Sequence, residues 1–375
     1  MTMNLTIALT HNCQLRCDYC YAGKKHHKVI SKETILKAIA LTFEMPMQKL
    51  EFGLFGGEPL LEWELFVWAT EQVEAEATKR AISLVKTVTT NGLLLTPDRV
   101  DWLREHGFYV VVSLDGNKAM HNTHRRYANH EGSFNTVLKG IKQLQTRYKN
   151  GGYTVVVVIT PQNIHHLNDS VAYLYEQLNI QKIHLSLNYY DMWEEKDEIM
   201  EAYRDIYHRL GFYVIEQYRQ GRVIDIDIFD DKIQTQISKG CTICSFGERK
   251  IAVAVSGNLY PCERLIGDDE GDLSIGNVYE GFNQSRRNGL IAQGGNNNDE
   301  CRACPLRDRC MNSCGCTNYT LTGEINMTHG VVCFFQKLFI EVADEVASTL
   351  YTEKNTLFLA KFYGTRESAE TTQTP

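Results

Sequence analysis

The sequence predicts an α/β fold in which parallel strands alternate with helices. Before residue 190 it contains six short runs of β-branched and apolar residues, and longer segments with helical spacing lie between them. The apolar runs are near-continuous, which is typical of parallel strands that are covered on both faces. With 375 residues, of which 43% are hydrophobic and 23% charged, the composition is that of a globular protein and excludes a disordered chain or a coiled coil.

The individual elements follow from these patterns. The expected strands cover residues 4–9, 49–55, 84–88, 108–114, 153–160 and 182–188. The expected helices cover residues 32–42, 64–77, 96–106, 136–149 and 164–178, and an aromatic-rich helix over 201–220 connects to the C-terminal third. Six βα units fit either a doubly wound sheet or an incomplete barrel, and periodicity alone leaves both open.

The charge balance and the cysteines limit the class of function. The net charge is −7 and no block of like charge stands out, which argues against a nucleic-acid partner. No apolar run is as long as a membrane helix, and the first residues lack the features of a secretory signal, so we expect a cytoplasmic protein without a membrane partner. Twelve cysteines in a reducing compartment favour metal binding over disulfides.

Three cysteines follow the first expected strand with the spacing Cys-x3-Cys-x2-Cys, at Cys13, Cys17 and Cys20, and Tyr19 stands just before the third. Three thiolates on one short loop suit three corners of a cubane [4Fe–4S] cluster. Because no fourth cysteine is near, one iron would stay open for a further ligand, as in catalytic metal sites. The structural alternative is a zinc site that borrows a histidine such as His11.

This cysteine motif resembles the signature of the radical S-adenosylmethionine (SAM) enzymes, and further motifs match in order. Gly56, Gly57, Glu58 and Pro59 resemble the family's segment that binds the methionine amino group of SAM. Glycines there let the backbone approach the ligand, and a carboxylate pairs with an ammonium group. The resemblance covers about residues 3–190 and implies an incomplete (β/α)6 TIM-like barrel with SAM and a [4Fe–4S] cluster.

Three more candidate residues follow the ends of expected strands, where βα architectures place their active sites. By resemblance, Asn91 and Ser113 would contact the adenosine and ribose of SAM, Arg125 its carboxylate, and Tyr19 would also belong to the cofactor site. Taken alone, Asn91 and Ser113 are equally well turn or helix-capping residues. Arg126 competes with Arg125 for the carboxylate.

The region from 239 to 335 is rich in cysteines, glycines and loops and holds nine of the twelve cysteines. Thiolate tetrads suit either iron–sulfur clusters or zinc, and the spacing alone leaves both open. Behind a radical SAM core the array resembles a SPASM domain, which carries two auxiliary [4Fe–4S] clusters. The resemblance implies one cluster on Cys241, Cys244, Cys262 and Cys314, and an outer cluster on Cys301, Cys304, Cys310 and Cys333. Cys316 is expected to be a free buried thiol.

Glu263 follows Cys262 directly, and in sulfatase-maturating relatives an aspartate at this place is proposed to take a proton from the substrate. We therefore treat Glu263 as a candidate base, with a surface acid as the alternative. The departure from aspartate argues against sulfatase maturation. The leucines after Pro59 do so too, because they are more similar to peptide-modifying maturases.

The resemblance implies a radical SAM/SPASM maturase that modifies a ribosomally made peptide or protein. A radical derived from SAM would abstract a hydrogen atom, and an oxidative crosslink or similar modification would follow. The alternatives are formylglycine formation in sulfatases, maturation of a small cofactor, and a non-catalytic iron–sulfur electron carrier. We expect a flavodoxin or ferredoxin as electron donor. Because the sequence starts at the first strand, we expect any leader peptide to be bound by the core, by the loop over 189–193 or by a separate protein.

The expected domain organisation is a radical SAM core over 1–225, a SPASM domain with a closing helix over 226–350, and a polar tail over 351–375.

Overall fold

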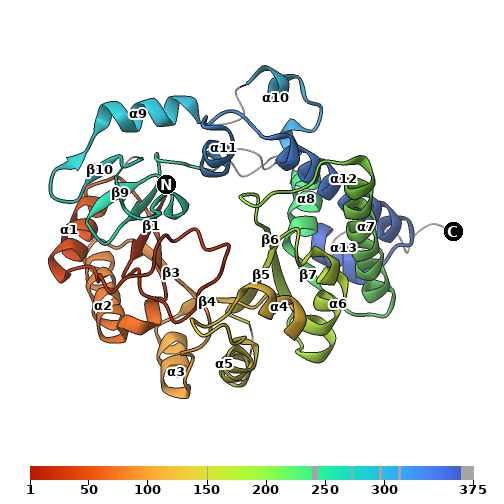
Figure 1. Ribbon diagram of the computed structural model, residues 1–375, viewed down its shortest axis with the longest axis horizontal. Coiled ribbons are helices and arrows are strands. Elements are labelled where there is room, and N and C mark those ends of the chain that lie inside the picture. The colour runs from red at the N-terminus through yellow and green to blue at the C-terminus, as the bar shows by residue number, and fades with distance from the viewer. Residues whose placement is uncertain (150, 239–243, 272, 295–297, 311–313, 365–375) are drawn as a thin grey trace. The chain divides into compact units, whose positions relative to one another are not determined.

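The computed structural model describes residues 1–149, 151–238, 244–271, 273–294, 298–310 and 314–364, and the chain divides into two compact units. Unit 1 comprises Met1–Leu114, His121–Thr154 and Cys244–Gly294, and unit 2 comprises Asp115–Met120, Val155–Ile243 and Gly295–Pro375. Figure 1 labels the elements of both units.

Unit 1 is built on strands in the order β11-β10-β9-β8-β1-β2-β3-β4, and the five from β8 to β4 run parallel. Their bounds are β1 (Thr2–Ala8), β2 (Lys49–Phe55), β3 (Ser83–Thr90), β4 (Phe108–Ser113), β8 (Lys250–Val253), β9 (Asn258–Tyr260), β10 (Gly276–Asn277) and β11 (Gly281–Phe282). The α/β class and the first four expected strands are confirmed. The short strands β8 to β11 were not expected, because two to four residues between glycines are too few to show a period.

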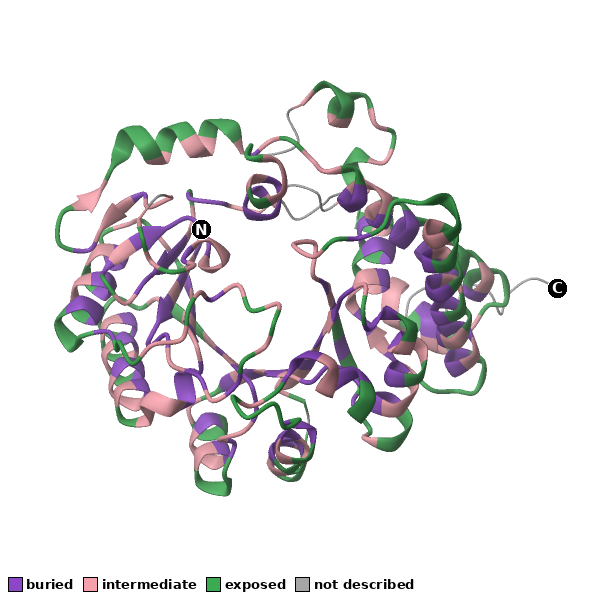
Figure 2. Ribbon diagram, viewed as in Figure 1, coloured by how far each residue is buried: buried purple, intermediate pink, exposed green. Residues whose placement is uncertain are grey.

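Helices cover one side of β1 to β4 (Figure 1). They are α1 (Lys32–Phe43), α2 (Trp63–Lys79), α3 (Pro97–Glu105) and α5 (Phe134–Arg147), each within three residues of the predicted bounds at both ends. Large apolar side chains such as Leu5, Phe52 and Phe66 are fully buried between these helices and the strands. Figure 2 shows this burial in the strands, whereas α9 (Gln284–Gln293) has no buried residue.

The second face of these strands differs from the expectation that both faces are covered by apolar side chains. Burial alternates along β1 and β2, and the partly exposed positions carry polar or small residues, except for Phe55 at the end of β2. Thr6, Gly53 and Thr87 lie side by side in register across β1, β2 and β3. One face of the sheet is therefore covered by buried apolar side chains, and the other carries mostly polar or small ones. The near-continuous apolar composition of the strands did not predict this difference.

Unit 2 holds β5 (Tyr153–Ile159) from Val155 on, together with β6 (Lys182–Leu187) and β7 (Asp225–Ile226), in that order and parallel. The predicted helix over 164–178 is three shorter turns, η2 (Ile164–His166), α6 (Leu167–Ala172) and the π-helical η3 (Tyr173–Gln177). A π-helical turn of five residues is too short to show a period of its own, so sequence periodicity does not reveal it.

The C-terminal part of unit 2 is helical. The long helix α12 (Gly330–Thr352) packs on α7 (Asp197–Arg219), α8 (Asp227–Ser238) and α13 (Thr356–Tyr363). The predicted closing helix is therefore present. Helix α13 lies within the segment expected to be a polar tail, and its Phe358 is fully buried. No helix in the described part of the chain is both long and apolar enough to cross a membrane.

Candidate active site

Parallel strands β1 to β4 end at one edge of the sheet, and the chain places most of the candidate residues there. The cysteine loop, which we define as residues 9–24, follows β1. The Gly56–Pro59 segment follows β2, Asn91 follows β3, and Ser113 is the last residue of β4. Convergence of strand ends is the reason that residues far apart in the sequence meet at this edge.

The cysteine loop presents its sulfur atoms with donors directed at them. Cys13 is buried, and the Leu15 N–H donates to its Sγ (N···S 3.4 Å). Cys20 is exposed, and Lys25 Nζ lies 3.0 Å from its Sγ. Donors around sulfur suit thiolates, because a thiolate accepts hydrogen bonds and attracts cations.

No three His, Cys, Asp or Glu side chains in the described residues converge as they would around a single metal ion. A cubane cluster makes a different demand, because each cysteine binds a different iron and the sulfurs stay apart. The Cys-x3-Cys-x2-Cys spacing in the sequence and the donors around Cys13 and Cys20 therefore fit a cluster on Cys13, Cys17 and Cys20. That ligand set remains a prediction.

The two glycines of the next loop let it lie directly against the cysteine loop. A Cβ atom on Gly57 would stand 2.2 Å from the Asn12 carbonyl oxygen, and one on Gly56 2.3 Å from the Thr10 carbonyl oxygen. In the same contact the Gly57 N–H donates to Thr10 O at 2.7 Å and the Glu58 N–H to Asn12 O at 2.8 Å. Only glycine permits this approach, so the motif has a structural role beside any ligand contact.

Glu58 is fully buried, and its carboxylate joins the ends of β2 and β3. Oε1 accepts hydrogen bonds from the Leu60 N–H at 3.1 Å and the Thr90 hydroxyl at 2.8 Å, and Oε2 accepts one from the Asn91 N–H at 2.7 Å. Burial raises the pKa of Glu58 to about 7, although these hydrogen bonds and the charge of Arg99 oppose the shift. Sequence reasoning assigned this side chain to the SAM ammonium group and missed its contacts within the protein.

Arg125 lies at the cysteine loop. It is buried, its guanidinium stands over the Tyr19 ring at 5.3 Å, and its carbonyl accepts a hydrogen bond from the Ser133 hydroxyl at 2.8 Å. The neighbouring His124 Nδ1 lies 3.2 Å from an oxygen of Asp18. Arg125 and Tyr19 are thus brought together as the sequence suggested, whereas Arg126 is exposed. Their contacts with SAM remain a prediction.

A second cysteine-bearing segment of unit 1 lies against the cysteine loop. Cys262 is buried and directly precedes the turn η4 (Glu263–Leu265). Arg264 stands 5.4 Å from the Tyr21 ring centre, and the Asp268 carboxylate accepts a hydrogen bond from the Lys24 N–H at 2.6 Å. The stretch that carries Cys262 and Glu263 is therefore held at the loop that carries the first three cysteines.

Glu263 forms an ion pair with Lys250, whose Nζ lies 3.0 Å from Oε2. Burial works against the charged carboxylate, but Lys250 outweighs it together with Arg264, and the pKa of Glu263 lies below its ordinary value. Cys262 and Cys244 help to raise the pKa of Lys250. A carboxylate in this setting is ionised at neutral pH, which makes it available to take up a proton but weakens it as a base.

The remaining cysteines lie mostly in unit 2. Cys301, Cys304, Cys310, Cys314 and Cys333 are partly buried. Cys316 is buried, as expected, and its sulfur lies 3.2 Å from that of Cys314. Cys241 lies outside the described residues, and the set that it would share with Cys244, Cys262 and Cys314 is divided between the two units. Both auxiliary ligand sets remain predictions.

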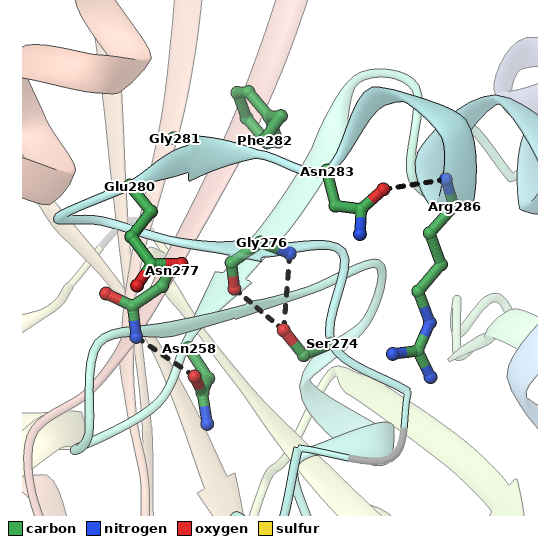
Figure 3. A pocket seen from close by; sticks show the side chains of 9 residues that line it. All are labelled: Asn258, Ser274, Gly276, Asn277, Glu280, Gly281, Phe282, Asn283 and Arg286. Carbon is green, nitrogen blue, oxygen red and sulfur yellow. Dashed lines mark hydrogen bonds between the residues drawn. The ribbon is translucent and has the colours of Figure 1, made fainter.

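A polar cavity of about 420 Å³ lies beside β9, β10 and β11 (Figure 3). Most of its lining groups bond one another: Asn277 donates to Asn258 at 3.0 Å, Ser274 donates to the Gly276 carbonyl at 2.7 Å, and Asn283 caps α9. None of the candidate site residues is among its lining residues. The cavity is therefore separate from the strand-end site.

Comparison with known proteins agrees with this geometry. Residues 7–174 match the model of the radical SAM superfamily. A cysteine-type anaerobic sulfatase-maturating enzyme of Clostridium novyi is 26% identical over 322 residues, which cover 81% of this chain and 85% of that protein.

Two solved structures are similar over most of this chain. The structure of native anSMEcpe with bound AdoMet and Cp18Cys peptide has a TM-score of 0.78 at 19% identity, with 94% of this chain and 99% of that chain covered. Streptococcus suis SuiB bound to precursor peptide SuiA has a TM-score of 0.60 at 14% identity, with 89% and 76% covered. The likeness confirms the partial-barrel α/β fold expected from the sequence motifs.

Proposed function

We propose that the protein is a radical SAM maturase, which would use a [4Fe–4S] cluster and SAM to modify a peptide or protein side chain oxidatively, because residues 7–174 match the model of the radical SAM superfamily. The observation that carries the proposal is the set of residues at the ends of β1 to β4, where the cysteine loop meets the Gly56–Pro59 loop, Asn91 and Arg125. The similar structures with bound peptides support a peptide substrate.

In this proposal Cys13, Cys17 and Cys20 hold the first cluster, and the eight cysteines named above hold two auxiliary clusters. Bound together, the reduced cluster and SAM supply a 5′-deoxyadenosyl radical, which is the chemistry that the chain itself lacks. Arg125, buried beside the cysteine loop, provides a fixed cation for the SAM carboxylate. The Gly56 and Gly57 backbone lies close enough to the loop to support a ligand there.

Glu263 is the proposed proton acceptor. Its ion pair with Lys250 keeps the carboxylate ionised. Glu263 also lies between Cys262 and Arg264, in the segment that contacts the cysteine loop through Arg264 and Tyr21. After Glu263 takes a proton, Lys250 keeps its positive charge, because the neighbouring Cys262 and Cys244 help to hold its pKa above the ordinary value. We further propose a cytoplasmic location and a flavodoxin or ferredoxin as the electron donor.

Two peptide reactions compete within this proposal. Crosslinking of a ribosomally made peptide is favoured by Glu263 and by Leu60 and Leu61, the departures from the sulfatase-maturase pattern. Oxidation of a cysteine or serine to formylglycine is favoured by the sulfatase-maturating relative that is similar over more than four fifths of both lengths.

The test is anaerobic incubation of the full chain with SAM, a reductant and either of two peptides: a small peptide encoded beside its gene, or a sulfatase peptide with the target cysteine. A crosslink appears as the loss of two hydrogens with a cyclic fragmentation pattern. Formylglycine appears as an aldehyde that reacts with a hydrazide. Cys17→Ala is the control and should yield neither product. If the wild-type chain forms no 5′-deoxyadenosine with reductant and SAM, the proposed function is refuted.

A further inference from the structure

The side chain of Asn91 is directed at Cys13. Its Nδ2 donates to Cys13 Sγ at 3.6 Å and to Gln14 Oε1 at 3.2 Å, so both amide hydrogens point to the cysteine loop. Its Oδ1 accepts a hydrogen bond from the Leu93 N–H at 3.0 Å. This last contact fixes which end of the amide faces the sulfur, because an N–H cannot receive the Leu93 donor.

The backbone of Asn91 is also held in place. Its N–H donates to the carboxylate of Glu58 at 2.7 Å, and Glu58 is fully buried and bonded to two further donors. The Glu58 N–H in turn donates to Asn12, one residue before Cys13. A closed circuit of hydrogen bonds therefore runs from the cysteine loop through Glu58 and Asn91 back to the sulfur of Cys13.

This arrangement leaves little of the Asn91 side chain for a nucleotide. The residue is only 7% exposed. Both N–H donors of its amide and the amide oxygen already have hydrogen-bond partners within the protein. The sequence motif suggested a contact with adenosine or ribose. The geometry favours a different partner, the cysteine sulfur.

We propose that Asn91 is a positioning residue for Cys13, and that its amide N–H raises the reduction potential of the cluster that Cys13 ligates. The inference rests on the proposed function, because it requires the first cluster. A hydrogen bond to a ligating sulfur withdraws electron density and favours the more negative, reduced state of the cluster. The Leu15 N–H donates to the same sulfur, so Cys13 has two donors and the loss of Asn91 removes one of them.

The experiment measures the potential of the cluster and the affinity for SAM separately, in the full chain. The first cluster is identified by the electron paramagnetic resonance signal that changes when SAM is added, and its midpoint potential is then titrated without SAM. Asn91→Leu removes the donor at similar size. Asn91→Asp keeps the acceptor for Leu93 but puts a carboxylate oxygen beside the sulfur. Asn277→Leu is the control, because it removes a hydrogen-bonded amide of the same unit on β10.

For Asn91→Leu we expect the ratio of reduced to oxidised cluster at a fixed potential to be about fivefold lower. This corresponds to a midpoint potential that is lower by about 40 mV, at 59 mV per tenfold for one electron. The shift in Asn91→Asp should be larger and in the same direction, and Asn277→Leu should match the wild type. SAM affinity should change little in all three.

An unchanged potential in both Asn91 variants, with weakened SAM binding, would overturn the inference and restore Asn91 as a nucleotide contact. If Asn91→Leu alone fails to hold the cluster, the midpoint potential of the cluster in Asn91→Asp decides the question. If the wild-type chain gives no signal that responds to SAM, the proposed function fails instead, and the two failures are thereby distinguished.

Discussion

Replacing Gly57 by alanine tests the contact on which the candidate site depends. The added Cβ would lie 2.2 Å from the Asn12 carbonyl oxygen and 2.6 Å from that of His11, and both are backbone atoms that no side-chain rotation can move. To reach an ordinary contact distance the two loops must separate by about 1 Å. The hydrogen bonds from Gly57 to Thr10 and from Glu58 to Asn12, now 2.7 and 2.8 Å, would then exceed hydrogen-bonding distance.

Each of these bonds contributes about 1 kcal/mol net, so we expect Gly57→Ala to lower the free energy of unfolding of unit 1 by about 2–3 kcal/mol. The assay is urea denaturation of the cluster-free chain, followed by the fluorescence of Trp63, Trp68 and Trp102, which lie in unit 1. Iron content after anaerobic reconstitution is the second readout, and it should fall because the cysteine loop is displaced.

Gly289→Ala is the matched control. A Cβ at Gly289, in α9, would meet no atom within 4 Å, so this substitution should be neutral or stabilise the helix by up to about 1 kcal/mol. If Gly57→Ala unfolds at the same urea concentration as the wild type and binds the same amount of iron, the two loops do not pack as described and the reasoning is refuted.

Three further predictions concern charge and metal. The pKa of Glu58 is about 7 in the folded chain and 4.5 when the group is exposed, so the folded state binds the proton more tightly. The contribution of Glu58 to the free energy of unfolding should therefore fall by up to about 3 kcal/mol as pH rises from 4.5 to 7. Glu58→Gln should flatten that slope in urea melts of the cluster-free protein. Lys250→Met should lower the free energy of unfolding by about 1–3 kcal/mol, because it leaves the Glu263 carboxylate without its counter-charge. The double variant Lys250→Met with Glu263→Leu should recover most of that loss. An equal loss in the single and the double variant would contradict a stabilising ion pair between the two residues. Iron analysis should give about twelve irons per chain and about eight in Cys17→Ala, and stoichiometric zinc in place of iron would reject the cluster assignment.

The sequence by itself determined the order of strands and helices in the first half of the chain. Apolar runs of five to eight residues and amphipathic segments of ten or more have a clear period, and the strands 49–55 and 108–114 were placed to within one residue at each end. It also predicted the chemistry of the site, because the spacing of Cys13, Cys17 and Cys20 and the glycines before Glu58 are local features.

Tertiary structure decided the features that sequence periodicity does not predict, namely the short strands and the contacts between distant residues. The strands β8 to β11 are too short to show a period and exist because β8 pairs with β1, a partner about 245 residues away in the sequence. The contacts that Glu58 and Asn91 make within the protein were decided in the same way. Both were assigned to SAM from their motifs, but a motif does not reveal which hydrogen-bonding groups the fold will bring to a side chain. Only the meeting of three parallel strand ends shows that Glu58 binds Asn91 and that Asn91 faces a sulfur, because these contacts join residues more than thirty positions apart.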